Sequence, residues 1–236
     1  MLDKSRVLGL LPARAGSKGI PGKNVRNLLG KPLVSWAAAA LRGAALVSRS
    51  ICSTNDEKVI EAVLKEGIEV PWIRPEVLSS DKALVVDVIL HALEKLEKEE
   101  GSSYDYVALV QATSPTVTSA DIDCAIEIAK KNDADTVITG FNAGQRHPST
   151  MFRVKENGSV DWYIAKEEKM LRRQDLSEVF IRTGLVYVVK VSSLRLSGSI
   201  YGNNIFPLII PEYRSITIDE EFDFCLAELI MGLSND

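Results

Sequence analysis

The sequence predicts an α/β fold of three layers, in which helices cover both faces of a mostly parallel sheet. Over the first two thirds of the chain, short apolar runs alternate with amphipathic stretches, which is typical of β-α-β units. Near residue 140 this alternation ends and a hairpin pattern follows. The 236 residues are enough for one domain with a sizeable core that carries a small insertion.

The first elements follow from the spacing of apolar residues. Val7 to Leu11 is an apolar run typical of a buried parallel strand. Pro32 to Arg42 places apolar residues at helical spacing, and Ser50 to Ser53 predicts a short second strand. Thr54 and Glu57 have the spacing of a capping box, so we expect them to open the next helix.

The same alternation continues to residue 139. The expected elements are an extended stretch at 68–73, a helix at 85–96, a strand at 107–110, a helix opened by the capping pair Thr118 and Asp121, and a strand at 136–139. After the insertion, the pattern predicts strands at 184–189 and 208–210 and a final helix at 220–233. We therefore interpret residues 1–236 as a single domain.

We assign the insertion to residues 141–183. Phe152 to Lys155 and Val160 to Trp162 predict two short strands, and Asn157-Gly158 between them predicts a tight primed turn. A small hairpin with apolar side chains needs a surface that covers them. That surface is either a second subunit or the protein's own domain.

Composition and charge exclude several classes of partner. A net charge of −4 and a pI near 5.4 argue against a nucleic-acid partner, because such proteins usually carry a basic face. No apolar run approaches the length of a membrane span, and the first residues lack a signal-peptide core. We therefore expect a cytoplasmic protein with no membrane partner.

The cysteines lack metal-ligand spacing and are expected to be core thiols: Cys52, Cys124 and Cys225.

A basic, glycine-rich loop follows the first predicted strand. Its glycines let the backbone fold closely around an anion and its cations supply positive charge: Gly16, Gly19, Gly22, Arg14, Lys18 and Lys23. A Walker loop would need a glycine at position 17 and a hydroxyl residue at position 24, where Ser17 and Asn24 stand. The Gly-x-Gly-x-x-Gly fingerprint of dinucleotide-binding folds is also missing. The loop therefore predicts a phosphate site of another kind.

Pro12 to Asn24 resembles the segment with which members of the acylneuraminate cytidylyltransferase family begin. These enzymes activate sugar acids as CMP-sugars. Further segments resemble family motifs in the same order, and together they cover nearly the whole chain: 30–33, 53–56, 74–76, 80–81, 109–115, 173–175 and 218–221. The resemblance implies a three-layer, Rossmann-like nucleotidyltransferase fold. It also implies a homodimer in which the insertion packs against the second subunit.

The resemblance implies attack by a hydroxyl of a small sugar acid on the α-phosphate of CTP, with pyrophosphate leaving. Such a transfer needs positioning and charge neutralisation more than a covalent nucleophile, so we expect cations and Mg²⁺ to dominate the site. The residues predicted to act in catalysis are Arg14, Lys23 and Asp219. The residues predicted to bind the nucleotide are Leu11, Ala13, Arg14, Gly16, Ser17, Lys18, Lys23, Asn24 and Arg74.

Four residues are predicted to bind the acceptor: Gln111, Thr113, Arg173 and Thr183. Gln111 follows the predicted central strand, at the edge where open α/β sheets bind ligands. Arginine is the natural planar partner of a carboxylate, and Arg173 matches the position of such a residue in the family. Family members that use sialic acid often have arginine and asparagine where Ile181 and Thr183 stand. Sialic acid and legionaminate-like or pseudaminate-like acids therefore remain alternatives.

Asp219 precedes the last predicted helix, so it is either an N-cap or a Mg²⁺ ligand. The family commonly has Asp-x-Asp here, and Thr217 replaces the first carboxylate. One carboxylate can suffice, since Mg²⁺ usually keeps waters and takes phosphate oxygens. Two alternatives remain open. One is another sugar or sugar-phosphate nucleotidyltransferase with a different nucleoside triphosphate, and the other is a non-catalytic nucleotide-binding homologue that lost part of its metal site.

Overall fold

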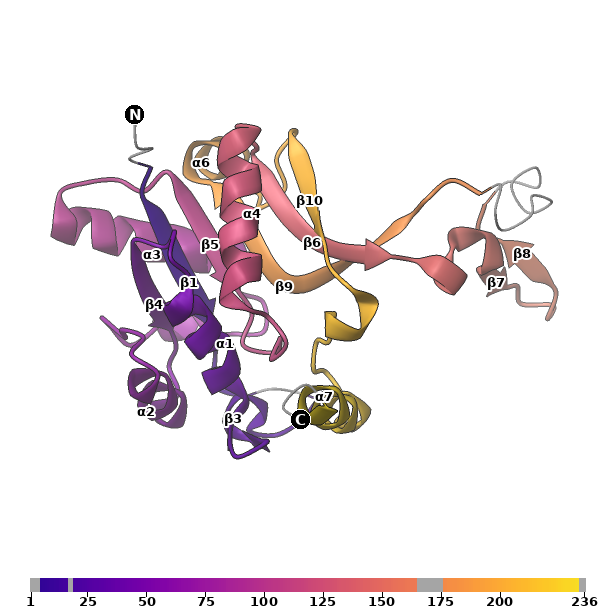
Figure 1. The fold of residues 1–236 in the computed structure, drawn as a ribbon, viewed down its shortest axis with the longest axis horizontal. Coiled ribbons are helices and arrows are strands. Elements are labelled where there is room, and N and C mark those ends of the chain that lie inside the picture. Colours follow the sequence, from indigo (N-terminus) through magenta and orange to yellow (C-terminus); the bar gives the residue numbers. More distant parts are fainter. Residues whose placement is uncertain (1–4, 17–18, 165–175, 234–236) are drawn as a thin grey trace.

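A computed structural model describes residues 5–16, 19–164 and 176–233. Six strands form one sheet in the order β10-β6-β9-β5-β1-β4 (Figure 1). Their bounds are β1 Val7–Pro12, β4 Arg49–Ser53, β5 Tyr106–Val110, β6 Thr136–Asn142, β9 Phe180–Lys190 and β10 Ile205–Ile209. Two short strands, β2 Asn27–Leu28 and β3 Lys31–Pro32, pair with each other outside this sheet.

The sheet is mostly parallel, as predicted, with one antiparallel strand. Leu10 of β1 pairs in parallel register with Ile51 of β4 and with Leu109 of β5. β10 is parallel to β6, whereas β9 runs antiparallel to both of its neighbours, β5 and β6. Because β6 leads the chain out to the insertion, β9 returns beside it in the opposite direction, as in a hairpin.

Helices cover both faces of the sheet, which confirms the three-layer α/β fold. The helices are α1 Leu33–Gly43, α2 Glu57–Lys65, α3 Val85–Glu100, α4 Ser119–Lys131, α6 Val191–Ser197 and α7 Glu221–Leu233. One core cluster joins α1, α2 and α4 to the sheet, and a second joins α3 and α6 to it. α7 forms a third cluster, in which Phe224 packs with Ile218 and Leu33.

The two predicted capping boxes have different outcomes. Thr118 and Asp121 make both reciprocal hydrogen bonds at the start of α4, as expected. The capping box of Thr54 and Glu57 is wrong, because Asp56 is the N-cap of α2 and accepts from the Lys58 amide. The Thr54 hydroxyl instead accepts from the Asp56 amide at 3.1 Å, so it stiffens the turn before the helix.

The long strands β6 and β9 carry an arm away from the main body (Figure 1). We call residues 143–164 and 176–179 the arm; it includes the predicted hairpin, formed by β7 Phe152–Val154 and β8 Val160–Trp162. The primed turn is wrong, because only Gly158 of the pair takes a positive φ, 79°. The Gly158 amide donates to the Lys155 carbonyl, which makes an ordinary turn followed by a left-handed glycine.

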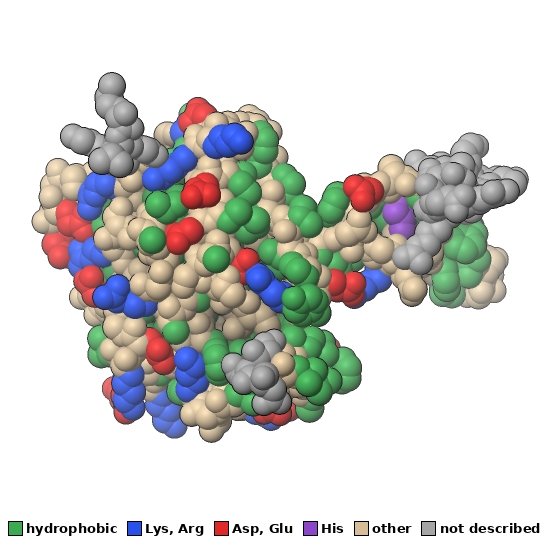
Figure 2. All heavy atoms as spheres, viewed as in Figure 1, with side chains coloured by type: hydrophobic (Ala, Val, Ile, Leu, Met, Phe, Trp, Pro, Cys, Tyr) green, Lys and Arg blue, Asp and Glu red, His purple; other side chains and the backbone are tan. Residues whose placement is uncertain are grey.

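The prediction that all three cysteines are core thiols is wrong for two of them. Cys52 is buried as predicted, but Cys124 and Cys225 are exposed, because they lie on the outward faces of α4 and α7. Hydrophobic side chains gather at the far end of the arm (Figure 2). Within the described ranges, no helix is both long enough and apolar enough to cross a membrane.

Candidate functional site

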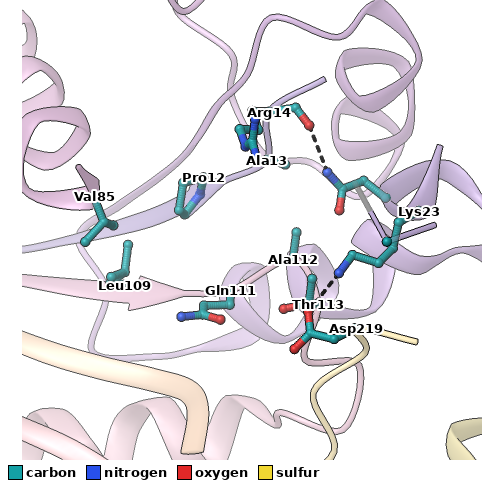
Figure 3. A pocket seen from close by; sticks show the side chains of 12 residues that line it. Pro12, Ala13, Arg14, Lys23, Val85, Leu109, Gln111, Ala112, Thr113 and Asp219 are labelled. Carbon is teal, nitrogen blue, oxygen red and sulfur yellow. Dashed lines mark hydrogen bonds and ion pairs between the residues drawn. The ribbon is translucent and has the colours of Figure 1, made fainter. Parts of the chain in front are cut away.

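A cavity of about 510 Å³ opens at the carboxyl ends of β1 and β5 (Figure 3). This is the edge at which open α/β sheets bind ligands, because the loops after parallel strands diverge there. Its walls come from four places in the sequence: the loop after β1, the end of β5, the start of α3 and the segment before α7. The lining residues are Pro12, Ala13, Arg14, Gly19, Lys23, Asn24, Val85, Leu109, Gln111, Ala112, Thr113 and Asp219.

The predicted phosphate loop is fastened to the strand beside it. The Ala13 amide donates to the Ser53 carbonyl at 3.0 Å, and the Ala15 amide donates to Oδ1 of Asn55 at 2.9 Å. Within the loop, Nδ2 of Asn24 donates to the Arg14 carbonyl at 3.1 Å. Asn24 therefore holds the loop closed by its side chain while lining the cavity. Ser17 and Lys18, also predicted to bind the nucleotide, lie outside the described residues.

Glycine is required in this loop for two different reasons. Gly16 takes a φ of 73°, a left-handed conformation that side chains disfavour. A Cβ added at Gly19 would lie 2.7 Å from the Asp219 carbonyl oxygen, so only glycine allows this approach. The loop after β1 and the segment before α7 therefore touch through their backbones. This contact brings residues 200 positions apart in the sequence to one wall of the cavity.

The Lys23 side chain also connects the loop after β1 to the segment before α7, through a hydrogen bond and an ion pair. It begins a short 3-10 helix, Lys23–Val25, and only 8% of the residue is exposed. Its Nζ donates to the Ile218 carbonyl at 2.6 Å. It also donates to Oδ1 of Asp219 at 3.0 Å (Figure 3). The Asp219 side chain is 74% exposed. The lysine is thus fixed in place by the protein, while its carboxylate partner remains accessible from solvent.

Arg14 lies between the cavity and a neighbouring hollow of about 310 Å³. One guanidinium nitrogen is 2.7 Å from Oδ1 of Asp81, and both side chains are partly exposed. Asp81 was not among the predicted site residues, although it falls in the segment 80–81 that resembles a family motif. An ion pair between residues this far apart in the sequence has no periodic signal, so the resemblance was the only indication of it.

Arg74 borders the hollow rather than the main cavity. It is 4% exposed, its Nε donates to the Ser53 hydroxyl at 3.1 Å, and a second guanidinium nitrogen donates to the Ser53 carbonyl. Burial, with a smaller contribution from the nearby Arg14, lowers the pKa of Arg74 to about 10. Arg74 is therefore charged at neutral pH. Among the described residues, no carboxylate pairs with it.

The predicted acceptor residues separate in the structure. Gln111 and Thr113 line the cavity at the end of β5, as their positions suggested. Thr183 does not line it, because its hydroxyl makes a buried 2.8 Å hydrogen bond to the Thr139 hydroxyl. The side chain of Leu11 lies wholly in the core. Arg173 lies outside the described residues.

The acidic residues near the cavity fit a metal that arrives with phosphate. Asp219 is the carboxylate that lines the cavity, and the described residues contain no cluster of three or more side chains able to hold a metal ion. Asp219 does not cap α7: Oδ2 of Asp223 accepts from the amides of Asp219 and Glu220, each at 2.8 Å. One carboxylate with phosphate oxygens and waters is a usual Mg²⁺ environment. Thr217 lines a separate cavity of about 520 Å³.

The chain is similar in sequence to known cytidylyltransferases. Residues 8–189 match the family model described as Cytidylyltransferase. The chain is 29% identical to a CMP-N,N'-diacetyllegionaminic acid synthase of Legionella pneumophila, over 98% of each chain. It is 27% identical to a pseudaminic acid cytidylyltransferase of Campylobacter jejuni, over 97% of each.

A solved structure supports the fold assignment. The structure of a CMP:2-keto-3-deoxy-manno-octonic acid synthetase complexed with CTP superposes with a TM-score of 0.66. The superposition covers 98% of this chain and 99% of that one, at 17% sequence identity. At this level of identity the likeness concerns the arrangement of strands and helices, and it confirms the predicted nucleotidyltransferase-type fold.

Proposed function

This chain belongs to the cytidylyltransferase family, and on that basis we propose that it transfers CMP from CTP to a sugar acid of the nonulosonic type, releasing pyrophosphate. Sialic acid and legionaminate-like or pseudaminate-like acids are the candidate acceptors, since relatives named for legionaminic and pseudaminic acids match nearly the whole chain. One observation carries the proposal: the phosphate loop, the end of β5 and Asp219 meet in a single cavity.

The triphosphate would lie in the main cavity against Arg14 and Lys23. Both cations already face carboxylates, Asp81 and Asp219, so phosphate oxygens would replace contacts of the same charge. Gly16 allows the backbone to approach, while Ala13, Ser17 and Lys18 stay predicted contacts. The nucleoside would extend past Arg14 into the hollow bordered by Arg74, with Asn24 holding the loop beneath it.

Charge neutralisation would supply most of the rate. As the bond from the α-phosphate to pyrophosphate breaks, negative charge develops on the leaving oxygens. Lys23 is buried and fixed by the Ile218 carbonyl, so it would stabilise that charge without reorganising. Asp219 would hold Mg²⁺, which supplies further neutralisation of the phosphates when bound. The acceptor hydroxyl would approach from the side of Gln111 and Thr113, opposite the leaving group.

We further propose that the arm mediates a homodimer and helps to complete the sugar site of the second copy. Exposed apolar residues cluster on it, including Met151, Phe152, Trp162 and Tyr163. The rings of Phe152 and Trp162 stack edge to face, 5.9 Å apart, which fixes an apolar surface without covering it. Sedimentation should give the mass of a dimer for the natural chain and of a monomer for a variant with Phe152→Asp and Trp162→Ser.

The proposed reaction is tested by pyrophosphate release. CTP and the other nucleoside triphosphates are each combined with Mg²⁺ and a panel of acceptors, which contains sialic, legionaminic and pseudaminic acids and several sugar phosphates. Release that needs both CTP and one of these acids would support the proposal. Release with a sugar phosphate, or with another triphosphate, would support the alternative transferase. No release with any pair would indicate the non-catalytic homologue.

A further inference from the structure

Arg182 lies at the ligand edge of the sheet, outside the lining of the cavity. β9 runs antiparallel to β5, and the last paired residues are Val110 and Val186, so the start of β9 lies past the carboxyl end of β5. There Gly184 lies against Gln111, since a Cβ at Gly184 would be 2.7 Å from Oε1 of Gln111. Arg182 is two residues further along the strand, roughly 7 Å away. It therefore borders the acceptor side of the site.

The side chain of Arg182 is held on an aromatic stack. Its Cζ is 5.3 Å from the centre of the Tyr201 ring, and Tyr201 packs edge to face on Tyr187 at 6.4 Å. Tyr187 pairs directly with Leu109 of β5, and residues directly opposite each other project from the same face of a sheet. Because Leu109 lines the cavity, the stack of Arg182, Tyr201 and Tyr187 extends the wall that Leu109 forms.

The charge of Arg182 is available to a ligand. Arg14 and Lys23 face carboxylates inside the site, but within the described residues no carboxylate pairs with the exposed Arg182. Stacking on an aromatic ring engages the flat face of a guanidinium and leaves its edge of N–H donors open. That edge matches a carboxylate, which it binds through two parallel hydrogen bonds.

We propose that Arg182, held on Tyr201, binds the carboxylate of the acceptor sugar acid and so selects acids over neutral sugars. This inference rests on the proposed function and names a specificity-determining residue for it. The acid would lie with its carboxylate toward the start of β9 and its attacking hydroxyl toward Gln111. Arg182 acts here in addition to Arg173, which the sequence predicts for the same task.

The test compares Arg182→Gln with the natural chain, using CTP and the acid that gives the fastest pyrophosphate release. The KM for the acid should rise roughly tenfold to hundredfold, the scale for losing a charged hydrogen-bonding pair, while the KM for CTP stays unchanged. Arg182→Lys should recover part of the loss, because it keeps the charge but not the paired donors. Tyr201→Ala should raise the KM for the acid less than Arg182→Gln does, because it removes only the ring on which Arg182 stacks.

A matched control and a neutral acceptor make the result specific. Arg195→Gln removes an exposed arginine from α6, where it pairs with Glu97 far from the cavity, and should behave as the natural chain. The methyl ester of the same acid should be a much poorer acceptor for the natural chain, and Arg182→Gln should abolish most of that preference. An unchanged KM and an unchanged preference for the acid would overturn the inference. If the natural chain releases no pyrophosphate with any acid, the proposed function fails and this inference fails with it.

Discussion

The two edges of the sheet use the same residue types for different purposes. At the amino edge, Arg6, Arg49 and the Tyr104 hydroxyl all donate to the carboxylate of Glu100, whose side chain is 18% exposed. At the carboxyl edge, Arg14 and Lys23 face Asp81 and Asp219, whose side chains are 43% and 74% exposed. Cations meet carboxylates in both places, but Glu100 is largely covered, whereas Asp81 and Asp219 are accessible.

This difference separates a structural cluster from a ligand site. Burial alone would raise the pKa of Glu100, but hydrogen bonds from Arg6, Arg49 and Tyr104 outweigh it and lower the pKa to about 2. An incoming anion would have to displace a carboxylate held by three donors. When a phosphate binds the cation of an exposed ion pair, the carboxylate left behind loses little free energy, because solvent stabilises its charge. Exposure of the acid therefore distinguishes the ion pairs of Arg14 and Lys23 from the Glu100 cluster.

The largest effect is expected from removing a cation at the carboxyl edge. Lys23→Ala should lower turnover at least about a hundredfold, the scale for losing one charge partner of the transition state, and Arg14→Ala should behave similarly. Steady-state pyrophosphate release measures it. Lys190→Ala is the matched control, because Lys190 makes a 2.6 Å ion pair with Asp133 at the amino edge. Near-natural turnover in Lys23→Ala would show that Lys23 does not stabilise the transition state.

The second effect should appear in stability and not in activity. Glu100→Gln should lower the free energy of unfolding by about 2 kcal/mol at neutral pH, since it weakens several charged hydrogen bonds, and leave both KM values unchanged. Urea unfolding measures it. Glu99→Gln is the control, because Glu99 is 58% exposed and lies 3.5 Å from Arg49.

The pH dependence of this effect has a definite sign. The folded pKa of Glu100 is lowered from its ordinary value of 4.5 to about 2. Its contribution is therefore fully present above pH 4.5 and is lost as the pH falls toward 2. The stability difference between the natural chain and Glu100→Gln should shrink over the same range. A difference that stays constant there would mean that the charge of Glu100 does not stabilise the amino edge.

A smaller effect is expected where the carboxyl edge depends on close backbone approach. Gly19→Ala places a Cβ 2.7 Å from the Asp219 carbonyl oxygen, so the loop must move away from Asp219. Overpacking of this kind costs on the order of 1–3 kcal/mol, and we expect the KM for CTP to rise about tenfold. Gly232→Ala on α7 meets no atom within 4 Å and should leave the KM unchanged. An unchanged KM in Gly19→Ala would show that this contact is not needed for nucleotide binding.

The sequence was sufficient wherever one local pattern dominates. The apolar run at 107–110 predicted a central strand, and Gln111 after it does line the cavity at the carboxyl edge. Thr118 and Asp121 are three residues apart and make the capping box without competition. Where two local hydrogen bonds compete, the pattern fails. Asp56 caps α2 by accepting from the Lys58 amide, while the Thr54 hydroxyl accepts from the Asp56 amide in the turn before the helix.

Contacts between distant segments could not be predicted in this way. Thr183 lies beside Gly184, which touches Gln111, yet its own side chain bonds to Thr139 on the neighbouring strand. The register of β6 and β9 is irregular between Ile138 and Gly140, so simple alternation does not decide where Thr183 lies. The pairing of Arg14 with Asp81 likewise depends on tertiary structure.

The smallest effect concerns the carboxylate that Thr217 replaces. Ile216 and Ile218 are both buried, so Thr217 and Asp219 face outward as the alternation predicted, although they border different cavities. Thr217→Asp would place a second hard oxygen ligand next to Asp219, and the Mg²⁺ concentration for half-maximal rate should fall about threefold. Thr217→Asn adds a polar group of similar size without charge and should not change it. Equal Mg²⁺ requirements for the two variants would show that position 217 is outside the reach of the metal, so that the carboxyl edge works with Asp219 and the triphosphate alone.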